Sequence, residues 1–262
     1  MIEVLREFFG YGGYERPVEG AFSWQHLTFT LSLVAIMITL GIIIGLKKRG
    51  SSYKEKNKVI IWAAILIDSF EIFKLIISYT RSPQMSTIIN NLPLFLCSIQ
   101  LITIPLAAFS KGRIKEAALD FVFIFGLLGG VLGTVLALQN YAAYPVLSFD
   151  NVVSGITHTI SGFTSLYIGV SGLSSMKKNN VWISFVILLV FVVVAYPVNV
   201  AFGSNYMFLM RDDGTPYFIF YNLVNGHKVL YPIIVVGTLL LYICIFYTVF
   251  YYIKKKNKIK SR

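Results

Sequence analysis

The chain has little charge for its length. Charged residues make up 13% of its 262 residues, whereas an average soluble domain contains about 25%. Hydrophobic residues make up 56%, and the mean hydropathy is +0.71. This composition excludes a disordered chain, a collagen, a coiled coil and an ordinary soluble domain. It leaves a helical membrane protein, provided that the apolar residues fall in runs of about 20.

Cysteine and histidine are also scarce. Two cysteines exclude a disulfide scaffold and a cysteine-rich metal protein. The three histidines show no H-x-x-x-H spacing, so the sequence predicts no metal site and no cofactor. The net charge of +11 raises the possibility of a nucleic-acid partner. We expect none, because the basic residues lie between apolar runs, where they act as topology signals.

The apolar residues predict an all-α bundle of seven transmembrane helices, because each run is long enough, or nearly so, to cross about 30 Å of hydrocarbon. We expect residues 1–262 to form a single integral membrane domain. The predicted spans are 24–46, 59–79, 92–109, 117–138, 152–174, 181–202 and 229–253.

The basic residues predict the orientation of the bundle. Most of the 23 Lys and Arg residues fall in 46–58, 110–116, 175–180 and 254–262, which alternate regularly with the apolar runs. The positive-inside rule therefore places the N-terminus outside and the C-terminus in the cytoplasm of a multi-pass protein of the cell membrane. We expect the tail from 254 to be a solvated charge run.

Polar and ionisable side chains within the spans are costly, so they mark candidate functional sites. Those we identify fall in the outer halves of the predicted spans. Cys97 lies roughly 8 Å and His158 roughly 9 Å below the outer interface, at ~1.5 Å per residue. Cys244 lies roughly 22 Å deep on the same scale, too far from Cys97 for a disulfide. The inner halves look nearly free of such groups.

Cys97 and His158 form the candidate catalytic pair. A thiol in an apolar environment becomes a nucleophile when a base removes its proton, and His158 is the base at matching depth. Two alternatives stay open at this point. Cys97 is also the kind of small residue that fills a membrane core, and a buried histidine often only bonds a backbone carbonyl.

Three charged residues follow one face of the second span. Asp68, Glu71 and Lys74 are spaced i, i+3, i+6. They form either an ion-pair ladder that holds the helix or, through Glu71, part of the site that orients His158 or binds a substrate cation. We expect Glu71 to matter more than Lys74, whose ammonium can extend outward to the interface.

Further candidate supporting residues lie near the same depth. Gln100 follows Cys97 by three residues, and the outer loop of about 203–228 supplies Asn205 and Tyr206, whose amide and phenol can hold an oxyanion or a lipid head group. This loop is expected to form a partial lid. His26 and His227 lie at the outer ends of their spans and complete the set.

The fourth span carries glycines at helical spacing, in FGLLGGVLGT. Gly129 and Gly133 have the GxxxG spacing that allows helices to approach closely. These are not phosphate-binding glycines, because no strand precedes them and no Lys-Ser/Thr follows.

Four motifs occur in the order LPLFLC, FGLLGGVLGT, SGITH and GSNYMFL on the seven predicted spans. In this, nearly the whole chain resembles the YwaF-like bacterial integral membrane family. That family is similar to the animal transmembrane acyltransferases, which transfer polyunsaturated acyl chains onto ether phospholipids. The resemblance implies acyl transfer centred on a cysteine with a partner histidine, and these roles fall on Cys97 and His158. Two residues before the cysteine, where that family often has a histidine, this chain has Phe95.

The leading hypothesis is a membrane-embedded acyltransferase that moves an acyl chain between lipids through a Cys97 thioester, in the extracytoplasmic half of the membrane. Its expected partners are membrane lipids; the sequence does not indicate an oligomeric state. One alternative is a zinc-dependent intramembrane lipid hydrolase that uses His26, His158 and His227. Another is a small-solute or proton-coupled transporter that uses Asp68, Glu71 and Lys74. A rhodopsin-like photoreceptor is disfavoured because residues 229–253 contain no lysine.

Overall fold

The computed structural model describes residues 2–260, and the side chains of residues 2–253. Within this part every regular element is helical, which confirms the all-α prediction. Besides two short 3-10 helices, Lys178–Asn180 (η1) and Tyr206–Phe208 (η2), the elements are α1 (Ile2–Phe8), α2 (Trp24–Lys48), α3 (Tyr53–Arg81), α4 (Met85–Asn90), α5 (Gln100–Phe109), α6 (Gly112–Val135), α7 (Leu138–Ala143), α8 (Phe149–Ser171), α9 (Val181–Phe202), α10 (Phe218–Leu223) and α11 (Leu230–Lys260).

Several helices have the length and composition of membrane spans. Among the described residues, four apolar stretches meet both requirements: Trp24–Lys48, Gly112–Ala143, Lys178–Phe202 and Leu230–Ile253. The helices α3 and α8 are also long enough to cross hydrocarbon, although they carry more polar residues. The chain therefore has the architecture of a multi-pass membrane protein. A total of seven spans stays a prediction.

The third predicted span is not a continuous helix. Only Gln100–Phe109 is helical, and residues 91–99 form turns and bends. A local reason is the Ser98 hydroxyl, which accepts the Phe95 N–H at 3.0 Å and donates to the Phe95 carbonyl oxygen at 3.1 Å. Such side-chain bonds compete with the helical ones. Irregular backbone at membrane depth is tolerated only where protein or water surrounds it, and here the bundle encloses Leu94 and Ile99.

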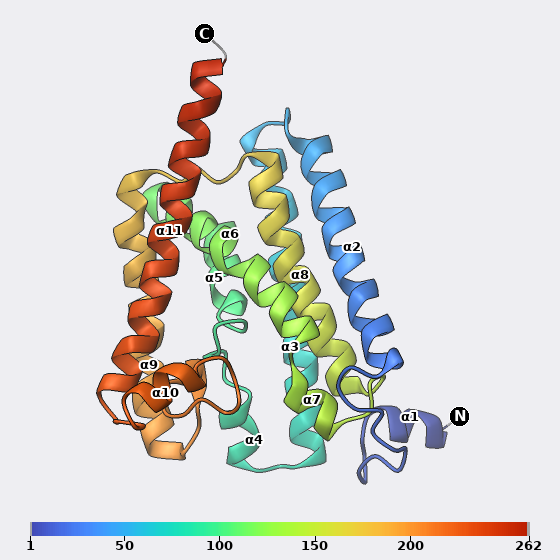
Figure 1. Cartoon of the computed structure of the whole chain (residues 1–262). Coiled ribbons are helices and arrows are strands. Elements are labelled where there is room, and N and C mark those ends of the chain that lie inside the picture. The colour runs from blue at the N-terminus through green and yellow to red at the C-terminus, as the bar shows by residue number, and fades with distance from the viewer. Residues whose placement is uncertain (1, 261–262) are drawn as a thin grey trace.

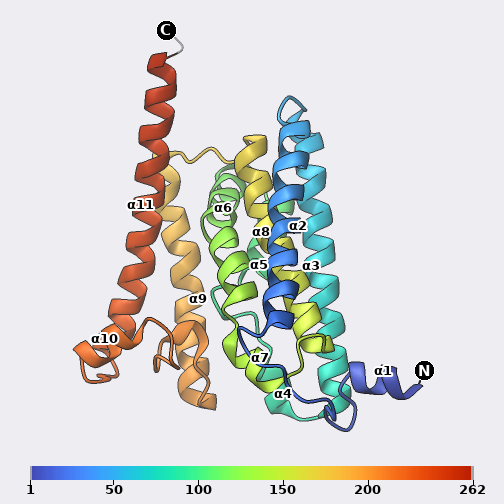
Figure 2. The ribbon, with the colours of Figure 1, turned by 45° about the vertical axis from the view of Figure 1, so that its right-hand side comes forward.

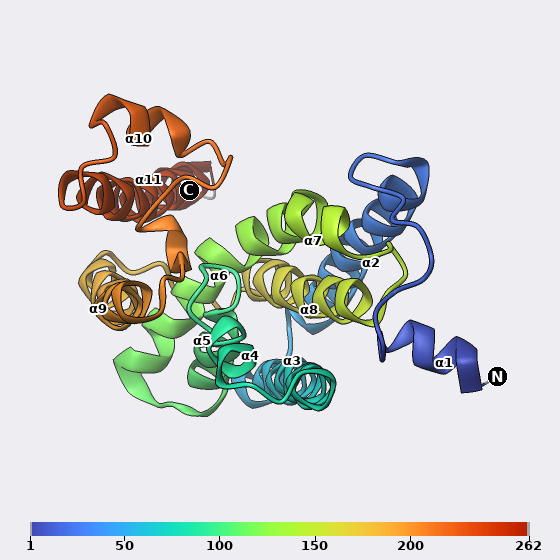
Figure 3. The same cartoon turned by 90° about the horizontal axis from the view of Figure 1, so that it is seen from below.

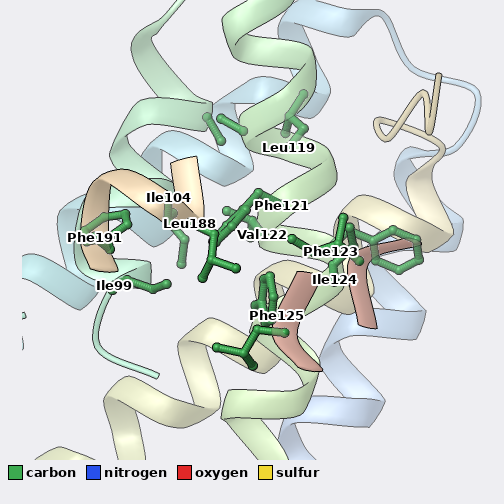
Figure 4. Packing of buried hydrophobic residues seen from close by; sticks show 14 of the residues in the cluster. Ile99, Ile104, Leu119, Phe121, Val122, Phe123, Ile124, Phe125, Leu188 and Phe191 are labelled. Carbon is green, nitrogen blue, oxygen red and sulfur yellow. The ribbon is translucent and has the colours of Figure 1, made fainter. Parts of the chain in front are cut away.

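The core of the bundle is built around α6 and α8. The middle of α6, from Ala117 to Gly126, is buried on all sides. Figure 1 shows α6, α8 and α2 running side by side, and Figure 3 shows α3 and α5 on the other side of this pair. Figure 2 shows α9 and α11 as a neighbouring pair at one flank. Phe121, Phe125 and Ile99 pack with residues of α9 in this core (Figure 4).

Small residues bring α6 and α8 into close contact. A Cβ atom added at Gly130 would lie 2.7 Å from the Gly162 Cα atom, and one added at Gly126 would lie 3.0 Å from the Ser161 carbonyl oxygen. Both approaches exclude a larger side chain without movement of the backbone. The glycines of FGLLGGVLGT thus bring α6 and α8 together, with the closest backbone approach at Gly126 and Gly130.

The two ends of the bundle differ in charge. The basic segments 46–58, 110–116 and 175–180 lie at the end where α11 finishes, whereas α1, α4, α7 and α10 lie at the opposite end (Figure 1). The side chains from 254 onward are outside the described part, so the expected charge run of the tail is not described. The grouping of the other basic loops is the arrangement that the positive-inside rule requires. Which end faces the cytoplasm stays a prediction.

The orientation predicts which end an impermeant reagent reaches. In a variant with Cys97 and Cys244 replaced by serine, a cysteine introduced at Ser261 is expected to resist labelling by an impermeant maleimide in intact cells. It is expected to react after the cells are lysed. A cysteine at Glu3, on the other end, serves as the control and should react in intact cells. Efficient labelling at 261 from outside would reverse the orientation.

Candidate functional site

Cys97 lies in the irregular segment just before α5. Its sulfur faces the backbone N–H groups of Cys97 and Ser98, and α5 begins at Gln100 without a side-chain cap. The positive end of a helix and free N–H groups stabilise an anion, and they act against the cost of removing a thiolate from water. The side chain is half-buried, so it is not sealed inside the core.

His158 lies on α8 and faces the same side of α6 as Cys97. A Cβ atom at Gly133 would overlap the His158 ring, and a Cβ atom at Gly129 would lie 3.3 Å from the Cys97 Cα atom. Residues four apart on a helix are separated by about 6 Å along one face. The two missing side chains of α6 therefore make room for the cysteine and the histidine within one helical turn of each other.

The imidazole of His158 is available for chemistry. Among the described residues it makes no hydrogen bond, and the charge of Lys74 acts on it. The ring is half-buried, like the thiol. The alternative in which His158 only bonds a backbone carbonyl therefore finds no support in the structure.

Glu71 and Lys74 form an ion pair on α3, and both side chains are 18% exposed. Lys74 does not extend toward the end of α3, as the sequence suggests. It turns back to Glu71, one turn nearer the middle of the helix. The Lys74 charge acts on both Cys97 and His158. A positive charge there stabilises an anionic sulfur and is repelled by a protonated imidazole. Asp68 is half-buried near Glu71.

Gln100 has a free donor. The residue is completely buried, and its Oε1 atom accepts the Thr103 hydroxyl at 3.0 Å. Its Nε2 atom is buried without a hydrogen-bond partner. A buried amide N–H group left unpaired is costly, so it indicates a place where a ligand oxygen is expected.

Asn205 and Tyr206, by contrast, are occupied by the fold. The Asn205 amide donates to the Arg211 carbonyl oxygen at 2.8 Å and to the Asp213 carboxylate at 2.7 Å, and its oxygen accepts the Met210 N–H at 2.9 Å. The Tyr206 hydroxyl donates to the Ile89 carbonyl oxygen. Both groups shape the loop that follows α9, so neither has a donor left for an oxyanion.

Tyr206 also joins this loop to the segment that carries the cysteine. Its ring packs edge-on against Phe95 with centroids 4.8 Å apart. The Asn199 side chain of α9 fixes the backbone of the same tyrosine: it accepts the Tyr206 N–H at 2.7 Å and donates to the Tyr206 carbonyl oxygen at 3.0 Å. The GSNYMFL motif thus holds the irregular segment against α9.

The other two histidines serve helix ends. The Nδ1 atom of His26 accepts the Phe22 N–H at 3.0 Å, and its ring packs on Tyr141. His227 is exposed, and its Nδ1 atom accepts the N–H groups of Val229 and Leu230 where α11 begins. Within the described part of the chain, no group of three His, Cys, Asp or Glu side chains is arranged to hold a metal. Cys97 and Cys244 are both free thiols.

Sequence reasoning missed a buried carboxylate near the basic end. Asp120 of α6 is completely buried. It accepts hydrogen bonds from Ser174, Asn180 and Tyr247 at 2.7, 3.0 and 3.1 Å, and from two backbone N–H groups. This position was not singled out from the sequence. The signal was an acidic residue inside an otherwise apolar run. Because its oxygens are saturated with donors, Asp120 acts as a tether between α6, α11 and the loop before α9.

A second missed cluster lies at the opposite end. Arg81 forms two bonds with the Asp150 carboxylate, at 2.6 and 2.7 Å, and Tyr14 donates to the same group at 2.8 Å. Burial and the neighbouring Asp150 carboxylate raise the pKa of Tyr14. This cluster fixes the N-terminal segment to α3 and α8. No local sequence pattern links three residues so far apart.

The comparison with known families matches the chain over most of its length. The sequence model of the TMEM164 family, a family of transmembrane proteins, covers residues 21–250. Neither a curated protein nor a solved structure matches the chain. The matched region contains Cys97, His158, the glycine face of α6 and the Asn205 loop. The chain belongs to the TMEM164 family.

Proposed function

We propose that the protein is a membrane-embedded acyltransferase that passes an acyl chain between lipids through a thioester on Cys97. The observation that carries the proposal is the shared glycine face of α6, which makes room for Cys97 at Gly129 and for the His158 imidazole at Gly133; within the described residues this imidazole makes no hydrogen bond. A thiol beside such a base is the arrangement that nucleophilic acyl transfer requires. No diffusible cofactor takes part.

The reaction has two half-reactions: acylation of Cys97, and transfer of the acyl chain to the acceptor. The Cys97 sulfur attacks the acyl carbonyl of a donor lipid while His158 accepts the thiol proton. The tetrahedral intermediate collapses to the thioester, and His158 returns the proton to the leaving oxygen. In the second half a lysophospholipid hydroxyl attacks the thioester with His158 as base. The new ester leaves with the acceptor lipid, and the proton restores the thiol.

The surroundings of the pair suit this chemistry. The start of α5 favours negative charge on the sulfur, and Lys74 does so against the opposing charge of Glu71. We assign the unpaired Gln100 amide as the donor to the oxyanion. The amide N–H groups of Asn205 and the hydroxyl of Tyr206 already donate hydrogen bonds to other protein groups. The substrates are phospholipid or lysophospholipid of the surrounding membrane, and we place the site in the extracytoplasmic half.

The kinship suggested by sequence supports the same reaction class. The motifs that resemble the YwaF-like family, and through it the animal acyltransferases, supply Cys97 and His158. The zinc hydrolase has less support, since no group of three His, Cys, Asp or Glu side chains in the described residues is arranged to hold a metal. The transporter has less support because the Asp120 carboxylate already accepts hydrogen bonds from five donors.

Lipid profiles of cells provide the direct test of this function. Cells that lack the protein are complemented with the wild type or with Cys97→Ser, and their phospholipid acyl composition is compared. We expect the wild type alone to restore the original composition. Equal restoration by Cys97→Ser at the same membrane abundance would contradict a covalent mechanism.

The role assigned to Gln100 predicts a loss of turnover without a loss of fold. Removing one oxyanion donor typically lowers kcat by about 10²–10³. Gln100→Leu is therefore expected to reduce acyl transfer by on the order of 100-fold, and Gln139→Leu, on an exposed position of α7, to leave it unchanged. Asn205→Ala is expected to lower thermal stability as well as activity. Wild-type turnover in Gln100→Leu would remove it from the site.

The Glu71–Lys74 pair is expected to act as a unit. Removing one partner leaves a half-buried charge unpaired, which costs more than removing both. This order reverses the one expected from sequence: Lys74→Met is now expected to lower turnover more than Glu71→Gln, because Lys74 turns back toward the site and its charge acts on both Cys97 and His158. The double variant should recover stability but not turnover. The exposed pair Glu55–Lys58, with the same spacing on α3, is the matched control and should tolerate both changes.

A further inference from the structure

A cavity lies at the basic end of the bundle, away from Cys97. Its volume is about 670 Å³, and it lies between the start of α3, the end of α5, the start of α6 and the loop that follows α8. Along α5 it is roughly 14 Å from Gln100, at ~1.5 Å per residue. A cavity of this size is in the range that holds a small organic ligand. The acyl-transfer reaction leaves it without a role.

Lys115 places an uncompensated positive charge in this cavity. Its side chain is more than nine-tenths buried, and its Nζ atom donates to the Ala108 carbonyl oxygen at 2.7 Å. The ammonium also lies 5.8 Å from the ring centroid of Tyr53. No described carboxylate forms a salt bridge with it. A buried ammonium is normally paired with an anion, and here two of its three N–H groups are free to bind one.

The start of α6 adds backbone N–H donors and further positive charge. The cap residue Lys111 makes no side-chain cap bond, and the first turn contains no acidic residue. The first N–H groups of a helix have no intrahelical acceptor, and together they carry about half a positive charge. Two basic side chains, Arg113 and Lys115, stand where acidic ones are favourable. Gly112, at φ +60°, leaves open space beside these groups.

The remaining polar groups of the cavity do not neutralise this charge. Glu116 is paired with Lys177, whose Nζ atom donates to both carboxylate oxygens at 2.8 Å. Asn57 donates from Nδ2 to the Ala108 carbonyl oxygen at 3.0 Å, but its Oδ1 atom is buried without a partner. That oxygen is an acceptor, so it matches a hydroxyl group rather than an anion.

We propose that this cavity binds a glycerophosphate group, with the phosphate against Lys115 and the start of α6 and a glycerol hydroxyl on the Asn57 oxygen. The same chemistry occurs in the head group of phosphatidylglycerol and in free glycerol 3-phosphate. The site is separate from the Cys97 site, and it does not depend on the reaction proposed there.

Binding to the purified full-length protein in phosphatidylcholine nanodiscs tests the proposal. The two probes are sn-glycerol 3-phosphate, followed by calorimetry, and phosphatidylglycerol added to the nanodisc and counted by native mass spectrometry. Binding of the soluble probe identifies a metabolite site, and binding of the lipid alone identifies a head-group site. Lys115→Met is expected to weaken binding at least tenfold, whereas Lys47→Met, an exposed lysine at the same end, should change it less than twofold.

Three further results decide the outcome. If Lys115→Met does not fold, Lys111→Met at the exposed rim replaces it, with an expected loss of about threefold that grows at low salt. Asn57→Leu should weaken glycerol 3-phosphate binding but not the binding of inorganic phosphate. Binding of neither probe to the wild type, or equal binding by folded Lys115→Met and Lys47→Met, would overturn the proposal.

Discussion

Replacing either Cys97 or His158 by alanine is expected to abolish acyl transfer, and replacing both is expected to be hardly worse than either alone. The cysteine needs the histidine to take its proton, and the histidine has no role in the reaction without the thiol. Residues that act as a unit are strongly non-additive when they are mutated. General base catalysis alone contributes about 10²–10⁴. Each single variant should therefore fall by at least that factor in a lipid turnover assay with purified protein.

Cys244→Ala is the matched control for this experiment. Cys244 is a free, half-buried thiol on α11, away from the glycine face. Its replacement should leave turnover close to the wild-type value. If the Cys97 and His158 effects multiply in the double variant, the two residues act independently, and a joint mechanism is wrong.

Replacing Gly133 by alanine is expected to cause nearly as large a loss without touching any reactive group. The added methyl group would overlap the His158 ring, so the imidazole or the α6 backbone must move. A misplacement of about 1 Å in a catalytic group can cost on the order of 100-fold in rate. Overpacking of this kind also costs about 1–3 kcal/mol of stability. We expect Gly133→Ala to stay folded and membrane-inserted while its turnover falls by about 100-fold.

Gly237→Ala provides the comparison for Gly133→Ala. Gly237 also lies inside a long helix, α11, and a Cβ atom there would meet nothing within 4 Å. Alanine is about 1 kcal/mol better than glycine in a helix, so this variant should be as stable as the wild type or more stable. Normal turnover in Gly133→Ala would show that the position of His158 against α6 is not needed.

Much of the fold follows from patterns that hold over a whole helix. Long apolar runs predicted α2 and α9 to within two residues, because hydrocarbon requires continuous helices of a set length. They also predicted α6 and α11, although α6 begins five residues earlier and α11 ends seven residues later than the apolar runs. The prediction of a continuous helix over 92–109 is wrong for a local reason. Ser98 bonds the Phe95 backbone, and the enclosing bundle tolerates the broken helix. Average hydropathy contains no information about either effect.

The sequence predicted the candidate site only in part. Depth along the spans brought Cys97 and His158 together, and the glycine spacing indicated close packing. The sequence does not say which partner each glycine faces, and the structure places Gly133 against the side chain of a catalytic candidate, His158 of α8. It also does not show which polar groups are already used. Asn205 and Gln100 look equivalent as amides, yet their hydrogen bonds give them different roles.

The measurement that tests the covalent mechanism most directly is the mass of the intact protein after brief exposure to a donor phospholipid and no acceptor. The wild type is expected to gain the mass of one acyl chain, removable by neutral hydroxylamine and located on Cys97 by peptide mapping. His158→Ala should gain little, and Cys244→Ala should gain as much as the wild type. Acyl transfer by a wild-type protein that never carries this adduct, or an adduct that persists in Cys97→Ala, would contradict the mechanism.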